Sequence, residues 1–246
     1  MTYCVALKLD RGLVFMSDTR TNAGFDNIST FRKLHCWSAP GKAVITLLTA
    51  GNLATTQAVV SLLDERGKAA DDRNPSILEQ PSMFQVVRLV GETLREVIAR
   101  QADTGERADA AFNASIIVGG QVGTGATRLF LIYPEGNFIE ASADTPYFQV
   151  GETKYGRPIL VRAFDRDMSF ADAVKLLMVS FDSTIKANLT VGLPLDYQLY
   201  ESDSMAPGPI RRIDMEDEYF NVISTGWGDA LKAAFHSLPP FTIPSG

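Results

Sequence analysis

The sequence predicts an α+β fold with four layers, αββα, in which two stacked β-sheets are covered by helices on both outer faces. Two observations support this prediction. Short runs of β-branched and aromatic residues alternate with long segments of helical periodicity, in the order strands, two helices, strands, helix, strands, helix. The 246 residues, 46% of them hydrophobic, contain no repeat, low-complexity tract or linker, and this length suits one large domain over residues 1–246.

The first element is a predicted β-hairpin. Residues 3–9 and 12–18 form two strand-like runs, and the Asp-Arg-Gly sequence that joins them at Gly12 is typical of a tight turn. Such a hairpin returns Asp18 to the side of Thr2. These two polar residues are therefore expected to be neighbours in space.

A second hairpin is predicted to follow. Residues 21–32 are rich in Thr, Asn, Gly and Asp, which predicts a loop that leads back toward Lys33. Residues 33–38 and 42–49 then form two further strand-like runs on either side of a proline-glycine turn. Lys33 thus stands where a loop enters a strand.

Four segments carry the apolar spacing of amphipathic helices. Gly67 is expected to end the first helix, and Ser82 and Ser169 are expected to cap the second and third. Residues 68–81 are charged and interrupted by proline, which predicts an exposed loop. The four helices are expected at residues 52–66, 82–102, 169–187 and 217–235.

Short strands and an apolar tail account for most of the remaining sequence. The tail, residues 237–246, is rich in proline and includes Phe241 and Ile243, so it cannot form a helix. An apolar segment of this kind is expected to dock on its own subunit or on a neighbour. The strands are expected at residues 114–120, 128–133, 137–141, 148–151, 193–200 and 210–213.

Thr2 is the candidate nucleophile. Removal of Met1 would leave Thr2 with a hydroxyl and a free α-amine on adjacent carbons. An α-amine has an ordinary pKa of about 7.7 to 8.0, so it is partly neutral near pH 7 and can accept the hydroxyl proton. A lysine held by a carboxylate would keep positive potential at the site and favour the neutral amine. Lys33 and Asp18 are the candidates for that pair.

Composition argues against several other classes of protein. A formal net charge of −6 gives no electrostatic match for nucleic acid or for an anionic membrane surface. The sequence contains no run of about 18 apolar residues, so no transmembrane helix is predicted. The N-terminus also lacks a secretory signal pattern, so a cytoplasmic location is expected. Two cysteines and two histidines give no metal-ligand spacing, and neither a metal nor an organic cofactor is predicted.

The first 35 residues resemble a known family. A Ser-Asp-Thr-Arg sequence containing Asp18 ends a strand sixteen residues after Thr2, and Lys33 follows fifteen residues later. This arrangement resembles the β subunits of the proteasome and the related bacterial peptidase HslV. The longer stretches at residues 17–24 and 31–35 are most similar to the bacterial ancestral β-subunit group called Anbu.

The resemblance implies roles for the matched residues and the fold of an N-terminal-nucleophile hydrolase. Thr2 matches the nucleophile of the family, Asp18 its carboxylate and Lys33 its lysine, with Arg20 in a supporting role. Gly51 matches the glycine whose backbone N–H binds the oxyanion, a role that suits a residue allowing close approach at a helix N-terminus. The resemblance also implies a substrate pocket formed by Thr21, Phe31, Thr49 and Leu53.

The function implied is that of a threonine endopeptidase subunit acting on peptides or unfolded proteins. Such subunits assemble with their own copies, here into a ring or an open helical assembly. The chain has no ATP-binding motif, so energy-dependent unfolding would need a separate unfoldase. Two alternatives stay open: a structural subunit with little or no catalysis, and an amidase acting on a small molecule. The residues that support the nucleophile beyond position 150 also stay open, the candidates being Glu152, Asp182, Ser183, Asn188 and Thr190.

Overall fold

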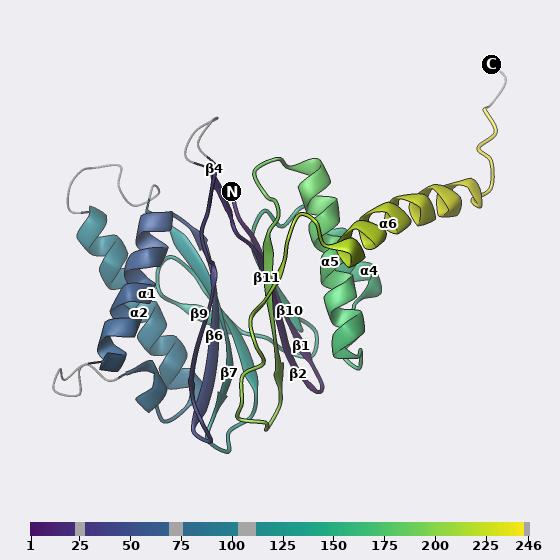
Figure 1. Cartoon of the computed structure of the whole chain (residues 1–246). Coiled ribbons are helices and arrows are strands. Elements are labelled where there is room, and N and C mark those ends of the chain that lie inside the picture. Colours follow the sequence, from purple (N-terminus) through teal and green to yellow (C-terminus); the bar gives the residue numbers. More distant parts are fainter. Residues whose placement is uncertain (23–27, 69–75, 103–111, 244–246) are drawn as a thin grey trace.

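The computed structural model describes residues 1–22, 28–68, 76–102 and 112–243. Its helices are α1 (Leu53–Lys68), α2 (Met83–Ala102), α4 (Arg157–Ala163), α5 (Phe170–Ala187) and α6 (Glu218–His236). Two β-sheets lie face to face, with α1 and α2 on the outer face of one and α4 and α5 on the outer face of the other (Figure 1). The predicted four-layer αββα fold is therefore confirmed.

The first sheet contains the predicted N-terminal hairpin. Its strands are β1 (Tyr3–Leu9), β2 (Gly12–Asp18), β10 (Tyr147–Gly151), β11 (Leu195–Glu201) and β12 (Arg211–Ile213). They pair antiparallel in the order β10-β1-β2-β11-β12. The hairpin is confirmed, because β1 pairs directly with β2, with Cys4 opposite Ser17.

The second sheet contains the second predicted hairpin, which is also confirmed. Its strands, in sheet order, are β5 (Leu34–Ala39), β6 (Ala43–Gly51), β7 (Ala114–Val122), β8 (Arg128–Ile132) and β9 (Phe138–Glu140). All neighbours in this sheet pair antiparallel. Strand β6 ends at Gly51 and helix α1 begins at Leu53, so strand and helix meet at the predicted oxyanion glycine.

Both faces of the inner strands are buried, and alternate residues serve different cores. In β6, Ile45 and Leu47 pack toward α1 and α2, whereas Val44 and Leu48 pack between the two sheets. Each fully buried side chain of this size stabilises the fold by about 1.5 to 3 kcal/mol. Burial on both faces explains why these strands read as nearly continuous apolar runs.

Some local predictions were wrong. Residues 21–32 were expected to form a loop, but β3 (Arg20–Asn22) and β4 (Ile28–Thr30) pair as a small separate sheet, with residues 23–27 outside the described chain. Gly67 lies inside α1, which continues to Lys68. Within the predicted exposed loop 68–81, of which residues 69–75 are not described, Ile77 is buried in a capped 3-10 turn.

The predicted serine caps are confirmed. The backbone N–H of Gln85 donates to Ser82 Oγ at 3.3 Å, and the backbone N–H of Asp172 donates to Ser169 Oγ at 3.0 Å. Each bond satisfies one of the free N–H groups at the start of a helix. The helices therefore start close to the places that their sequences indicated.

Helix α6 extends away from the layered body, and the chain continues beyond it into the tail (Figure 1). Asp217 caps the helix by accepting a hydrogen bond from the backbone N–H of Phe220, whose side chain packs into the core. From Leu231 onward every described residue is exposed. Among the described residues, no helix has the length and apolar character needed to cross a bilayer.

Candidate active site

The hairpin of β1 and β2 brings a carboxylate to the start of the chain. Asp18 ends β2, and its Oδ1 accepts a hydrogen bond from the backbone N–H of Tyr3 at 3.0 Å. Thr2, the residue before Tyr3, accepts a hydrogen bond at its carbonyl oxygen from the backbone N–H of Glu152 at 2.7 Å. The position of Thr2 is therefore fixed by β2 on one side and by the end of β10 on the other.

Lys33 reaches the same carboxylate from the residue just before β5. Its Nζ donates to Asp18 Oδ1 at 2.8 Å and to the carbonyl oxygen of Arg20 at 2.7 Å. The side chains of Lys33 and Asp18 are only 5% and 0% exposed, so solvent screens their charges little. Thr2 and Lys33 also line one cavity, so the structure brings all three predicted residues together.

Burial and local charge set the protonation properties of this site. Burial raises the pKa of the Asp18 carboxyl, and the Lys33 ammonium and the Tyr3 N–H act in the opposite direction. The pKa of the Met1 α-amine is lowered, first by burial and then by the Lys33 ammonium, whereas Asp18 and Glu152 act to raise it. The charge of Lys33 thus favours a neutral amine at the start of the chain.

A cavity of about 250 Å³ opens beside Thr2. Three of the four predicted pocket residues, Thr21, Thr49 and Leu53, line it. The prediction for Phe31 was wrong: its side chain is 36% exposed and does not line the cavity, and its backbone N–H donates to the Thr19 carbonyl oxygen, just after β2. The complete lining is Met1, Thr2, Thr21, Lys33, Thr49, Ala50, Gly51, Leu53 and Thr56.

Gly51 supplies a backbone N–H at the edge of this cavity. The Thr49 N–H donates to the Lys33 carbonyl oxygen at 3.0 Å, and the N–H of Gly51, two residues along the strand, faces the same side beyond the start of β5. Gly51 has a φ of +117°, and a Cβ there would overlap the Asn113 carbonyl oxygen and lie 2.7 Å from Ala114 Cα. Backbone conformation and close packing therefore both require glycine here.

A polar network links the end of β10 to the end of α5 behind Thr2. Glu152 is buried, and its Oε2 accepts a hydrogen bond from Asn188 Nδ2 at 2.9 Å. Asn188 Oδ1 in turn accepts hydrogen bonds from the backbone N–H and the hydroxyl of Thr190, at 3.0 and 2.6 Å. Because the Glu152 N–H holds the Thr2 carbonyl, the network is tied directly to the candidate nucleophile.

The other two open candidates bond within their own helix. Asp182 forms an ion pair with Lys186, with Oδ2 and Nζ 3.0 Å apart, and the Ser183 hydroxyl donates to the Val179 carbonyl oxygen at 3.0 Å. Both bonds span one turn of α5. Of the five candidates beyond residue 150, Glu152, Asn188 and Thr190 are therefore the ones connected to Thr2 by hydrogen bonds, with Thr190 joined through Asn188.

Arg20, the first residue of β3, forms hydrogen bonds through both its backbone and its side chain. Its carbonyl oxygen accepts the second hydrogen bond of Lys33, and its guanidinium donates to the Leu189 carbonyl oxygen at 2.9 Å. The guanidinium also lies against Gly192, where a Cβ would overlap it. Arg20 thus joins the lysine to the segment that follows α5, an arrangement that suits the supporting role predicted for it.

Sequence reasoning did not single out Ala50 or Thr56 as cavity residues. Both follow from a strand–helix junction at Gly51, since Ala50 is the residue before the glycine and Thr56 lies on the first turn of α1. Within the described ranges, no group of three or more His, Cys, Asp and Glu side chains is arranged to hold a metal ion.

Two packed sheets between helical layers, with a threonine just before the first strand, define the proteasome type of N-terminal-nucleophile fold. The family model described as a proteasome subunit matches residues 2–192. The chain belongs to the proteasome subunit family, and within it to the Anbu group, the ancestral bacterial β-subunits. The resemblance seen in the first 35 residues therefore extends over the whole chain.

Three solved structures document this relationship. Anbu (Gly-1) mutant from Hyphomicrobium sp. strain MC1 is 47% identical, with a TM-score of 0.90 and coverage of 99% of this chain and 100% of that one. Anbu from Yersinia bercovieri is 46% identical, with a TM-score of 0.90 and coverage of 98% and 100%. The subunit in the helical assembly of the Anbu complex from Pseudomonas aeruginosa is 45% identical, with a TM-score of 0.90 and coverage of 99% of this chain and 98% of that one. A search of the curated proteins found no match.

Proposed function

We propose that the protein is a threonine peptidase subunit that hydrolyses peptide bonds in peptides or unfolded proteins, with Thr2 as the nucleophile after removal of Met1. The observation that carries this proposal is the buried contact of 2.8 Å between Lys33 Nζ and Asp18 Oδ1 beside Thr2. A shielded ammonium at this position favours both a neutral amine and a more acidic hydroxyl. Membership of the proteasome subunit family supports the same conclusion.

In the proposed reaction, Thr2 Oγ attacks the peptide carbonyl carbon while the hydroxyl proton passes to the Thr2 α-amine. The tetrahedral oxyanion accepts a hydrogen bond from the Gly51 N–H. When the C–N bond breaks, the Thr2 ammonium returns the proton to the leaving amine, and an ester on Thr2 remains. The neutral α-amine then takes a proton from a water molecule, whose oxygen attacks the ester. When the C–Oγ bond breaks, the ammonium returns that proton to Thr2 Oγ and the acid is released.

The cavity beside Thr2 is proposed to hold the side chain that precedes the cleaved bond. Its lining is mostly small, with Thr21, Thr49, Ala50 and Leu53 in place of large aromatic residues. A volume of about 250 Å³ is modest for a ligand site. A small or medium uncharged side chain is therefore the preferred substrate group.

The proposal includes self-assembly in the cytoplasm, as a ring or an open helix of identical subunits. A helical assembly formed by the related Anbu complex of Pseudomonas aeruginosa supports this part. Confinement of active sites inside an assembly would restrict substrates to short or unfolded chains. A separate unfoldase would then be needed for folded substrates.

A second candidate function is that of an assembly subunit with little or no turnover. Retention of Met1, which precedes Thr2 and lines the same cavity, would favour it. While Met1 is attached, the Thr2 nitrogen is an amide and cannot accept the hydroxyl proton. The two candidates therefore differ in the chemical state of a single nitrogen atom.

The test combines intact-mass measurement of the protein purified from its native host with an electrophile that forms bonds to both the hydroxyl and the α-amine of an N-terminal threonine. Loss of Met1 and labelling of the wild-type protein are expected. Thr2→Ser keeps both groups and should be labelled, whereas Thr2→Ala should not. A retained Met1, or equal labelling of Thr2→Ala, contradicts the proposal. Peptides and small amides offered side by side then separate a peptidase from a small-molecule amidase.

A further inference from the structure

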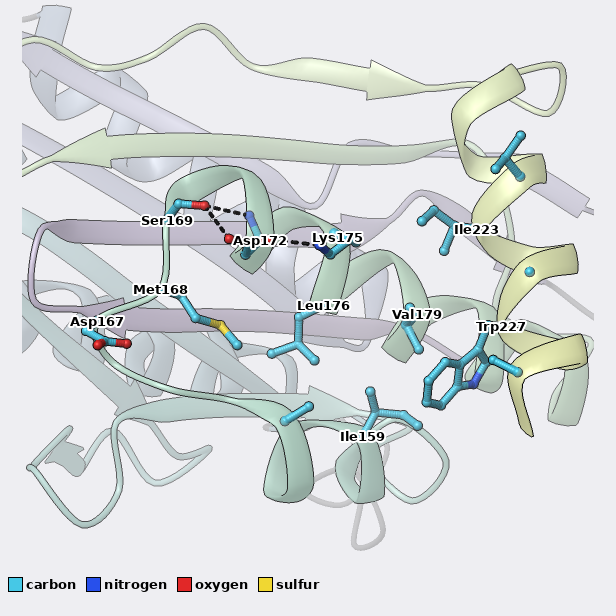
Figure 2. Close-up of a pocket in the computed structure, with 14 residues that line it drawn as sticks. Ile159, Asp167, Met168, Ser169, Asp172, Lys175, Leu176, Val179, Ile223 and Trp227 are labelled. Atoms are coloured by element: carbon cyan, nitrogen blue, oxygen red, sulfur yellow. Dashed lines mark hydrogen bonds and ion pairs between the residues drawn. The ribbon is translucent and has the colours of Figure 1, made fainter. Parts of the chain in front are cut away.

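A large apolar groove lies on the helical layer over the first sheet, between α4, α5 and α6. Its volume is about 810 Å³. Figure 2 shows side chains from three helices around one space: Ile159 from α4, Leu176 and Val179 from α5, and Trp227 from α6. The charged lining groups lie toward one end, where Lys175 Nζ and Asp172 Oδ1 are 2.7 Å apart in an ion pair. The rest of the surface offers apolar contacts to an incoming segment.

The same chain carries an apolar segment that is not packed against the subunit. We define residues 238–243 as the tail segment, and all of them are exposed. Leu238, Phe241 and Ile243 are 64%, 85% and 81% exposed. Large apolar side chains gathered at this exposure usually mark a surface that is covered by a partner.

We propose that the groove between α4, α5 and α6 receives the tail segment of a second copy of this chain. The contact joins two different surfaces of the same protein, so each subunit offers one groove and one tail segment. Such a head-to-tail contact repeats from copy to copy, and it closes into a ring or continues as an open helix according to the rotation between subunits.

The chemistry of the tail segment matches that of the groove. Its sequence, Leu-Pro-Pro-Phe-Thr-Ile, contains no charged side chain, so no ionised group would lose its hydration on entering an apolar groove. Pro239 and Pro240 fix their φ angles and favour an extended polyproline conformation, which reduces the entropy lost on docking. The charged pair at the end of the groove is already satisfied within α5.

The direction of α6 explains why the occupant is a second copy. The last α6 residue that lines the groove is Ala230, and the helix continues to His236. Ser237, the residue before the tail segment, therefore lies roughly 10 Å beyond the groove, at 1.5 Å per helical residue. Leu238 N–H donates to the Phe235 carbonyl oxygen, and the chain then runs away from α4 and α5 (Figure 1). An intramolecular contact would require the chain to reverse.

The assembly of a relative is consistent with this contact. The related Anbu complex from Pseudomonas aeruginosa forms a helical assembly. The family model matches residues 2–192, whereas α6 and the tail segment lie outside that match. The groove is thus partly built from an element that the general family pattern does not include, and the inference does not depend on the chemistry of Thr2.

The first experiment places a photo-crosslinking phenylalanine analogue at position 241 of the full chain. Light and heavy isotope-labelled copies are mixed, reassembled and irradiated, and the crosslinked peptides are identified by mass spectrometry. Crosslinks between light and heavy chains, from position 241 to α5 or to residues 222–230, are expected. Crosslinks confined to one chain, crosslinks to other surfaces, or none at all would overturn the proposal. The same analogue at exposed Phe84 on α2 serves as the control and should not label the groove.

The second experiment compares charged variants on both sides of the contact. Phe241→Asp and Val179→Asp should each weaken self-association by about tenfold or more, measured by sedimentation over a range of concentrations. Val161→Asp is the matched control, because Val161 is 65% exposed on α4 and does not line the groove. Circular dichroism checks that each variant is folded. If Val179→Asp fails to fold, Phe241→Asp, in an exposed segment, still decides the matter: unchanged self-association refutes the contact.

Discussion

Lys33 Nζ and Asp18 Oδ1 lie 2.8 Å apart in an almost completely buried ion pair, formed between residues from two different sheets of the fold. The backbone N–H of Tyr3 donates to the same oxygen, whereas Asp18 Oδ2 is buried without a hydrogen-bond partner among the described residues. One carboxylate oxygen therefore holds both the lysine and the first strand. Loss of either contact is expected to affect stability as well as chemistry.

The first prediction concerns Lys33→Met, which keeps much of the side-chain volume but removes the charge. The buried Asp18 would lose its ionic partner, and the free energy of unfolding should fall by about 3 to 5 kcal/mol, measured by urea denaturation. Peptidase activity should be lost. Lys154→Met is the control. It removes the same charge from a side chain that is 79% exposed, whose Nζ lies 4.0 Å from Glu152 Oε1. A Lys33→Met protein with normal activity would show that the lysine is not needed for catalysis.

The second prediction concerns Gly51→Ala. The new Cβ would overlap the Asn113 carbonyl oxygen at a φ of +117°, so the end of β6 must shift and carry the Gly51 N–H with it. We expect kcat to fall by about 10²-fold or more, as for the loss of one oxyanion donor. Gly41→Ala is the matched control, since Gly41 also has a positive φ but a Cβ there meets nothing within 4 Å. Gly41→Ala should lower the free energy of unfolding by roughly 1 kcal/mol and leave kcat unchanged.

Much of this site could be predicted because its parts are local in sequence. The tight turn at Gly12 fixes the register that returns Asp18 to the side of Thr2. The junction of strand and helix at Gly51 is also local in sequence, but the role of Gly51 as an oxyanion donor came from the family resemblance. Lys33 was a candidate because a lysine beside Asp18 suits the chemistry and because Lys33 stands where a loop enters a strand, and the family resemblance supported that choice. No local pattern shows that its side chain turns inward to Asp18 in the other sheet.

Other features depend on contacts that no local pattern reveals. Helix α4 was not predicted, since it has only seven residues, its first turn lacks a side-chain cap, and buried Leu160 holds it in place by packing against distant elements. The choice of Glu152, Asn188 and Thr190 among five candidates needed the hydrogen bond between the ends of β10 and α5. The path of the chain around Phe31 depended on the unpredicted β3–β4 sheet.

The third prediction concerns Tyr3→Phe, which tests how β1 is held against α5. The buried Tyr3 hydroxyl is 2.8 Å from Ser180 Oγ and accepts a hydrogen bond from Gln149 Nε2. Its removal leaves both partners with unmet bonding capacity, so the free energy of unfolding should fall by about 1 to 3 kcal/mol. Tyr155→Phe at a 40% exposed position should change it by less than about 0.5 kcal/mol. Equal thermal denaturation midpoints for the two variants would contradict the prediction.

The fourth prediction concerns the pH dependence of catalysis and rests on the proposed role of the Thr2 α-amine. The neutral amine is the base, so kcat/KM should fall as the pH drops through the pKa of that amine. Burial and the Lys33 ammonium lower the pKa of the Met1 α-amine from 8.0. These groups should act in the same direction on the Thr2 amine exposed by Met1 removal. The acid limb of the profile should therefore lie below pH 8.0.

Glu152→Gln separates charge from structure at this site. The carboxylates of Glu152 and Asp18 act to raise the pKa of the N-terminal amine, because a negative charge stabilises the ammonium form. Glutamine removes one of these charges but keeps a side-chain oxygen for the Asn188 amide, so the acid limb of kcat/KM should move to lower pH. A purely structural role would lower the rate at every pH without moving the limb. Glu92→Gln, at an exposed position on α2, should leave the profile unchanged.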